Sequence, residues 1–256
     1  MMQVRILGCS GGIGQKVRTS SYLVDHDILL DAGTGVGDLT LEEMLQIKHI
    51  FITHSHMDHV AIIPLLVDTL FSSLKQPIIV HALKETIDAL QTHFFNWTIW
   101  PDFTELPSLE ASVLKFEEMK IGDVYELNGR SVEMIEVNHI VPAVAYAVKT
   151  QNSIFVYSGD TTTNDSLWDK LNTYPRLDLM VVESAFANHD IHLANVARHY
   201  CPELLAADLK KLRHKPKLGI SHLKPGEETL IMDECRKAFG DDWDLHQLSS
   251  GDVFQL

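Results

Sequence analysis

Short apolar runs separated by polar turns dominate the first part of the chain. This spacing is typical of strands joined by tight connections. The His26-Asp27 pair, between the second and third runs, indicates a hairpin turn. The predicted strands are Val4–Leu7, Ser20–Val24, Ile28–Asp31 and Lys48–Thr53.

Longer stretches with helical spacing follow these strands. Asp38–Ile47 mixes polar and apolar residues at roughly helical intervals, and Val60–Leu74 is apolar enough to predict a buried helix. Pro77–Val80 predicts another strand. Lys84–Phe95 predicts a helix that ends before the Trp100-Pro101 step, because a residue that precedes proline disfavours helical geometry.

The second half of the chain repeats this alternation. Asn128-Gly129 is a strong hairpin signal. Helices are predicted at Pro202–Lys211 and Glu227–Phe239. The predicted strands are Val124–Leu127, Arg130–Val137, Ala143–Thr150, Ser153–Tyr157, Leu179–Val182 and Lys217–Ile220. Without a repeat, a low-complexity segment or a linker, residues 1–256 are expected to form one α/β domain, an αββα four-layer sandwich.

Composition narrows the class of protein. The chain has 256 residues, of which 45% are hydrophobic, and this is enough to bury one large core. No apolar run approaches about 18 residues, so a membrane span is not expected. The N-terminus lacks the long apolar run of a secretory signal. Cys9, Cys201 and Cys235 form no CxxC pair and suggest no disulfide framework, which fits a cytoplasmic protein.

The charge balance ranks the classes of substrate. Lys and Arg total 21 against 35 Asp and Glu, which gives a formal net charge of −14. Such a field repels long polyanions, so binding to nucleic acid is not favoured. A small phosphate ester drawn to bound cations remains compatible with the same charge.

A dense group of potential metal ligands follows the apolar run Ile50–Ile52. His54, His56, Asp58 and His59 lie within six residues. Imidazole and carboxylate are common ligands of zinc and related metals. In an extended segment, residues 54 and 56 point the same way and can grip one metal. Once the chain has turned, Asp58 and His59 can face a second metal.

Three further candidates lie downstream, each directly after an apolar strand. His139, Asp160 and His222 stand where loops commonly carry chemistry. A histidine or aspartate at one strand end is more often structural. Together with the upstream group, these three supply the ligands that a two-metal site still needs, and the Asp160 carboxylate could bridge both metals.

The order HxHxDH, a distant His, Gly-Asp-Thr and a later His resembles the metallo-β-lactamase superfamily, from Val4 to about His222. Ile6–Gly12 and Leu29–Gly33 resemble its phosphodiesterase branch. The resemblance implies that His54, His56 and His139 hold one metal. It implies that Asp58, His59 and His222 hold the other, and that Asp160 bridges. Two divalent ions are expected, with Zn²⁺ favoured and Mn²⁺ or Fe left open.

Three narrower segments resemble class II cyclic-nucleotide phosphodiesterases: Phe95–Pro101, Cys201–Leu209 and Ser221–Pro225. This resemblance implies hydrolysis of 3′,5′-cyclic nucleotides, cAMP or cGMP, to 5′-monophosphates, and a possible homodimer. Trp97 and Trp100 are candidates for a wall on which a nucleobase stacks. Core packing or a dimer contact is an equal alternative for these aromatic side chains.

The tRNA 3′-processing nuclease RNase Z shares the ligand pattern, and Glu183 and His199 match its Glu and His near the leaving group. We therefore expect Asp58 to orient the nucleophile, and His199, supported by Glu183, to act as general acid. Lys224 is a candidate phosphate contact. An RNase Z-like endonuclease, a lactonase, a thioesterase and a non-catalytic metal or redox protein remain alternatives.

The glycine-rich segment Gly8–Gly14 carries no phosphate-loop signature. No GK[ST] follows it and no GxGxxG is present. These glycines are interpreted as turn formers.

Overall fold

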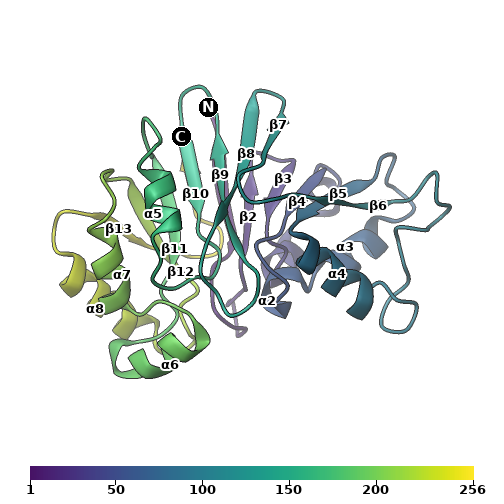
Figure 1. Cartoon of the computed structure of the whole chain (residues 1–256). Helices are drawn as coiled ribbons and strands as arrows, with labels where there is room; N and C mark the ends of the chain where they lie inside the picture. The colour runs from purple at the N-terminus through teal and green to yellow at the C-terminus, as the bar shows by residue number, and fades with distance from the viewer.

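Two seven-stranded mixed sheets pack face to face, and helices cover their outer surfaces (Figure 1). The computed structural model describes every residue from Met1 to Leu256. The first sheet, in spatial order, contains β14 (Val253–Gln255), β1 (Gln3–Gly8), β2 (Ser21–Val24), β3 (Ile28–Leu30), β4 (His49–Phe51), β5 (Ile78–Ala82) and β6 (Leu114–Glu118). The second contains β13 (Asp244–Gln247), β12 (Lys217–Ser221), β11 (Leu179–Glu183), β10 (Ile154–Tyr157), β9 (Val144–Lys149), β8 (Arg130–Glu136) and β7 (Val124–Leu127).

Helices form the two outer layers. The longer ones are α3 (Ile63–Leu70) and α4 (Lys84–His93) on the first sheet, and α7 (Pro202–Leu209) and α8 (Glu228–Phe239) on the second. The shorter ones are η1 (Thr34–Asp38), α1 (Leu41–Met44), α2 (Met57–Val60), α5 (Ser166–Leu171), η2 (Asn188–Asp190) and α6 (Ile191–Ala197). No helix combines the length and the apolar composition that crossing a bilayer requires.

Three apolar clusters separate the layers. Between the sheets, Val4 and Ile6 of β1 pack with Phe51, Tyr146 and Phe155, all fully buried. A second cluster fills the space beneath α3 and α4, and a third lies beneath α5, α7 and α8. The prediction of a four-layer αββα sandwich is therefore confirmed.

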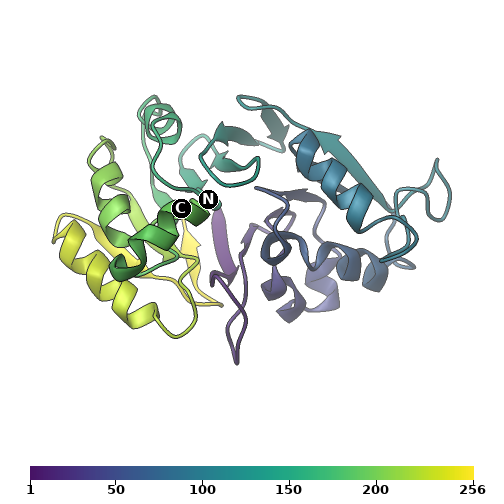
Figure 2. The ribbon, with the colours of Figure 1, turned by 60° about the horizontal axis from the view of Figure 1, so that its bottom comes forward.

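The parallel strands bring their carboxyl ends to one edge of the sandwich. In the first sheet β3 to β6 are parallel, and in the second β10 to β13 are parallel. The segments that follow β3, β4, β8, β10 and β12 therefore emerge on the same side, which Figure 2 turns toward the viewer. This edge carries the candidate metal ligands.

Two predicted helices are wrong in extent. Asp38–Ile47 contains only the end of η1 and the single turn α1, which begins at a capping box between Thr40 and Glu43. Val60–Leu74 is not one helix: α2 ends at Val60, and α3 begins at Ile63 with Pro64 in its first turn. Proline fits the first turn of a helix but not its interior, so the chain restarts there.

Short elements were missed, and the predicted hairpin was found. β6, α5, α6, β13 and β14 carry too few residues to show a period by themselves. β14 forms one edge of the first sheet and pairs with β1, about 250 residues earlier in the sequence. The hairpin between β7 and β8 turns at Asn128 and Gly129, whose φ angles of 46° and 81° are those of a type I′ turn.

Candidate metal centre

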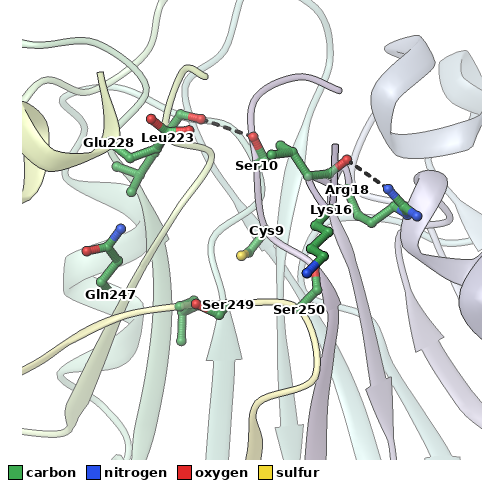
Figure 3. Close-up of a pocket in the computed structure, with 11 residues that line it drawn as sticks. Cys9, Ser10, Lys16, Arg18, Leu223, Glu228, Gln247, Ser249 and Ser250 are labelled. Atoms are coloured by element: carbon green, nitrogen blue, oxygen red, sulfur yellow. Dashed lines mark hydrogen bonds between the residues drawn. The ribbon is translucent and has the colours of Figure 1, made fainter. Parts of the chain in front are cut away.

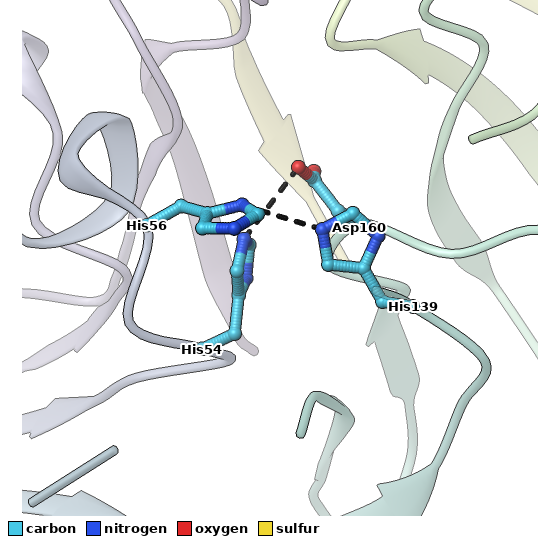
Figure 4. Close-up of side chains that lie close together, drawn as sticks. All are labelled: His54, His56, His139 and Asp160. Carbon is cyan, nitrogen blue, oxygen red and sulfur yellow. Dashed lines mark hydrogen bonds and ion pairs between the residues drawn. The ribbon is translucent and has the colours of Figure 1, made fainter. Parts of the chain in front are cut away.

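The loop between β4 and α2 supplies the first group of ligands. His54 lies three residues after the end of β4, and His56 occupies the N-cap of α2. Their side chains converge with His139, which follows β8, and Asp160, which follows β10 (Figure 4). The potential ligand atoms of these four residues all lie within 4.8 Å of one another.

A second group shares Asp160 with the first. Asp58 and His59, in the first turn of α2, meet Asp160 and His222 with ligand atoms again within 4.8 Å of one another. Asp160 Oδ2 lies 3.4 Å from His59 Nε2 and 3.7 Å from His54 Nε2. The seven predicted ligands therefore come together as two groups that meet at one carboxylate.

Hydrogen bonds on the far side of the rings show which nitrogen faces inward. His59 Nδ1 lies 2.6 Å from Asp31 Oδ2, and His139 Nδ1 lies 3.0 Å from the Arg198 carbonyl oxygen. These oxygens can only accept, so each Nδ1 carries a hydrogen and each Nε2 points toward the centre. Such an arrangement is typical of histidines that bind metals.

The buried nitrogen atoms provide a test of metal fit. His54 Nε2, His59 Nε2 and His222 Nδ1 are buried without any hydrogen-bond partner. A buried polar atom without a partner is costly, and one divalent cation in each ligand group would satisfy these three nitrogens. Imidazole nitrogens and carboxylate oxygens suit zinc and related ions, so these residues fit two metal ions.

Burial and nearby negative charge shift the pKa values of the ligand histidines in opposite directions. Burial lowers the pKa of His139 to about 4 and that of His54 well below its usual range, which keeps both rings neutral and able to ligate. For His59 burial also lowers the pKa, but the carboxylates of Asp160 and Asp31 outweigh it and raise the pKa. Cations in the two groups would neutralise this concentrated negative charge.

Asp31 supports the centre without joining either ligand group. It follows β3 in the left-handed region, with φ of 55°, and it is fully buried. Its carboxylate accepts hydrogen bonds from Thr53 N and Oγ1, from His59 Nδ1 and from Tyr157 Oη, at 2.6–2.9 Å. Sequence reasoning noted the segment but assigned Asp31 no role. An aspartate at a strand end, just before Ala32-Gly33, was the available signal.

The glycine-rich segment packs against the last ligand. His222 is in the left-handed region, with φ of 59°, and its N–H donates to the Cys9 carbonyl at 2.6 Å. A Cβ on Gly11 would lie 2.5 Å from the His222 carbonyl oxygen. Figure 3 shows the pocket beside this junction, where Ser10 Oγ donates to the Leu223 carbonyl at 3.3 Å.

This packing corrects the interpretation of Gly8 and Gly11 as turn formers. Neither glycine has a positive φ, and a Cβ on Gly8 would meet the Thr19 carbonyl oxygen at 2.0 Å. These residues are glycine because neighbouring backbone approaches too closely for any side chain.

A histidine–glutamate pair lies beside the two ligand groups. His199 Nδ1 lies 2.7 Å from Glu183 Oε1, and the His199 ring centre is 5.0 Å from that of His139 and 5.2 Å from that of His222. Glu183 also accepts from the N–H groups of Thr161 and Ala185. Burial lowers the pKa of His199, but the Glu183 carboxylate outweighs it and raises the pKa to about 9.

Lys224 lies near this pair, over the ring of Phe186, whose centre is 5.7 Å from that of His199. It is half-buried, its Nζ donates to the Gly11 carbonyl at 3.1 Å, and it lies 5.6 Å from the centre of the Phe186 ring. The Lys224 charge lowers the pKa of His199, against the larger effect of Glu183.

The two tryptophans proposed to contact a nucleobase, Trp97 and Trp100, lie away from the ligand groups. Trp97 and Trp100 belong to the segment between α4 and β6, at the outer end of the first half of the molecule (Figure 1). Trp100 packs against the apolar cluster beneath α3 and α4, and Trp97 is 59% exposed. Neither residue joins a ligand group. Trp100 fits the core-packing alternative, whereas for the exposed Trp97 a wall for a nucleobase or a dimer contact stays a prediction.

Comparisons with known proteins show which proteins this chain resembles. Residues 39–163 match the family described as cAMP phosphodiesterases class-II. A probable 3′,5′-cyclic-nucleotide phosphodiesterase of Yersinia pestis is 30% identical over 206 residues, which cover 70% of this chain and 57% of that protein. A ribonuclease Z of Methanosarcina acetivorans is 29% identical over 161 residues, which cover 58% of this chain and 48% of the relative. The chain thus spans about half the length of these two relatives.

A solved structure of similar fold defines the class. The metallo-β-lactamase fold protein YhfI from Bacillus subtilis superposes with a TM-score of 0.82 over the whole of both chains, at 18% identity. The chain is a metallo-β-lactamase-fold protein. Within that fold it is related to the class-II phosphodiesterases, and these relationships support a metal-dependent hydrolase.

Proposed function

We propose that this protein is a two-metal phosphodiesterase that hydrolyses 3′,5′-cyclic nucleotides to 5′-monophosphates. The observation that carries the proposal is the pair of ligand groups sharing Asp160, with the His199–Glu183 pair directly beside them. The similarity of residues 39–163 to class-II cAMP phosphodiesterases supports the choice of substrate.

The metals would be held as the two groups suggest. His54, His56 and His139 would hold one ion, Asp58, His59 and His222 the other, and Asp160 would bridge them. Zn²⁺ suits this donor set, as do Mn²⁺ and Fe. Bound metals of this kind activate water near neutral pH and neutralise charge on phosphoryl oxygens.

The side chains around this centre have distinct roles in the reaction. The Asp58 carboxylate, 32% exposed, orients the attacking water and takes its proton. The water oxygen forms a bond to phosphorus as the bond from phosphorus to the 3′ oxygen breaks. Because Glu183 occupies Nδ1 of His199, Nε2 is the atom that gives the 3′ oxygen its proton. Lys224 contacts the phosphate as a point charge.

The first test removes one ligand. His56→Ala should lose bound metal and hydrolysis of cyclic nucleotides by more than about 100-fold, because its nitrogen has no substitute in the group. The fold should survive. Metal analysis, activity and circular dichroism measure these three properties, and the parent protein after exhaustive chelation should behave like the variant. His26→Ala, on an exposed turn, is the control. An active, metal-free His56→Ala protein would refute the proposal.

The similarity to ribonuclease Z makes an RNA endonuclease the second candidate. Its large polyanionic substrate fits poorly with a net charge of −14. Rates on cAMP, cGMP, a simple phosphodiester, precursor tRNA, a lactone and a thioester separate these activities. Faster cleavage of precursor tRNA than of either cyclic nucleotide would establish the second candidate instead.

A further inference from the structure

A cavity of about 450 Å³ opens beside the metal ligand His139. It lies between the segment that follows β8 and the segments that follow β5 and β6. Apolar side chains form much of its wall, including Leu83, Ile121 and Ile140, and the last two are 52% and 56% exposed. A cavity of this size with an apolar wall accommodates a flat heterocycle.

Arg198 contributes the guanidinium of this cavity, and contacts with His139 hold it in place. The Arg198 backbone is left-handed, with φ of 54° and ψ of 53°. Its carbonyl accepts from His139 Nδ1 at 3.0 Å, and its Nη1 donates to the His139 carbonyl at 2.9 Å. Contacts from both its backbone and its side chain therefore hold Arg198 to a metal ligand, and such pre-organisation reduces the entropy lost when a ligand binds.

The remaining donors of Arg198 have no partner. Its Nε and Nη2 make no hydrogen bond in the structure, and no carboxylate forms an ion pair with it. The cavity also contains the carboxylates of Glu85 and Glu136, which are exposed and likewise unpaired. The residues that line the cavity therefore include a guanidinium with two free donors and two unpaired carboxylates.

We propose that this cavity binds the nucleobase of the substrate and prefers guanine to adenine. The inference rests on the proposed function and deepens it. Guanine presents O6 and N7 as paired acceptors, which match the free Nε and Nη2 of Arg198. Its N1–H and N2 amino group are paired donors for a carboxylate. Adenine places an amino donor beside N7, so it meets the guanidinium with one matched and one opposed contact.

The closing experiment compares two cyclic nucleotides and a diester without a base. We expect kcat/KM of the metal-loaded protein to favour cGMP over cAMP by about tenfold, the discrimination that a good bidentate contact provides. Arg198→Lys and Glu85→Gln should each move this ratio toward one, and should reduce the rate on bis(4-nitrophenyl) phosphate far less than that on cGMP. Arg213→Lys and Glu126→Gln, on exposed residues outside the cavity, should keep the parent ratio.

Binding separates failure of this proposal from failure of the proposed function. Calorimetry with 5′-GMP and 5′-AMP measures base preference without turnover, and tighter binding of 5′-GMP that Arg198→Lys abolishes would support the subsite. Hydrolysis of cAMP and cGMP with equal kcat/KM, or a preference for cAMP, would overturn the subsite while the phosphodiesterase proposal survives. Hydrolysis of neither would refute that function, and equal affinity for the two monophosphates would then overturn the subsite as well.

Discussion

At the scale of single residues, Asp31 couples the first sheet to the orientation of the ligands. A buried carboxylate is costly unless it is fully hydrogen-bonded, and Asp31 accepts bonds from Thr53, His59 and Tyr157. Thr53 in turn contacts His54 Nδ1 through its hydroxyl group at 3.0 Å. One side chain therefore orients a histidine in each ligand group.

Asp31→Asn should weaken metal binding by about 10- to 100-fold, the usual cost of losing a supporting partner of a metal-binding histidine. An amide at this position must turn its NH₂ group toward donors, which disturbs His59 or Thr53. Metal content after titration with a competing chelator measures the effect. Asp38→Asn, on the exposed pair with Arg18, serves as the control. Equal metal affinity in the two variants would exclude the supporting role.

At the scale of elements, ligand placement depends on where short segments begin. α2 starts at Met57, so Asp58 and His59 lie in its first turn while His54 and His56 remain in the extended segment before it. The residues of the extended segment therefore belong to one ligand group, and those of the helical turn belong to the other. The last ligand depends instead on close packing between two loops, where Cys9 and Gly11 pair with His222 and Leu223.

Gly11→Ala tests that packing. The added methyl group would lie 2.5 Å from the His222 carbonyl oxygen and 3.0 Å from its ring, so the ligand must move. We expect the variant to retain one tightly bound metal and to bind the second at least about tenfold more weakly. Gly37→Ala, where a Cβ meets nothing within 4 Å, should bind both metals like the parent protein. Two tightly bound metals in Gly11→Ala would show that this packing is dispensable.

At the scale of the whole molecule, the edge opposite the metal centre ties the two sheets together. Arg130 begins β8 and donates to both oxygens of Asp27 at 2.7 Å and to Asp25 at 2.8 Å, in the turn that precedes β3. At about 3.3 Å per residue, the far end of β8, which leads to His139, lies about 20 Å from Arg130, and β3 separates Asp27 from Asp31 by about 13 Å. The ion pairs that join the two sheets and the residues of the metal centre therefore lie at opposite ends of the same strands.

Arg130→Ala should lower the free energy of unfolding at pH 7 by about 3 kcal/mol, because it leaves two largely buried carboxylates without their cation. Burial raises the pKa of Asp27, but Arg130 outweighs it and holds the pKa below its ordinary value of 3.8. The stabilisation is thus complete above pH 3.8 and disappears as the pH falls through the lowered value.

Urea titrations at several pH values measure this effect. Arg176→Ala, which breaks an exposed pair with Asp178, is the control and should lose less than about 1 kcal/mol. Metal content should stay at the parent level in both variants. A metal-depleted Arg130→Ala protein that remains folded would contradict the separation of the two ends.

Local spacing explains why much of this protein could be predicted from its sequence. The alternation of strands and helices predicted the αββα sandwich, and Asn128-Gly129 predicted its hairpin. The ligands could be proposed because four of them lie within six residues, and the other three each follow a strand. These signals depend on near neighbours along the chain, which any single sequence displays.

Contacts between distant segments were decided only by the tertiary structure. No pattern of neighbouring residues shows that Asp31 accepts hydrogen bonds from His59 and Tyr157. Nor does any show that Gly11 packs against His222, or that Arg198 donates to the His139 carbonyl. The order of strands in the two sheets determines which loops meet, and that order follows from packing the whole core. The same packing places Trp100 against the apolar cluster beneath α3 and α4. The sequence by itself determined which residues can bind metal, and the fold decided what surrounds them.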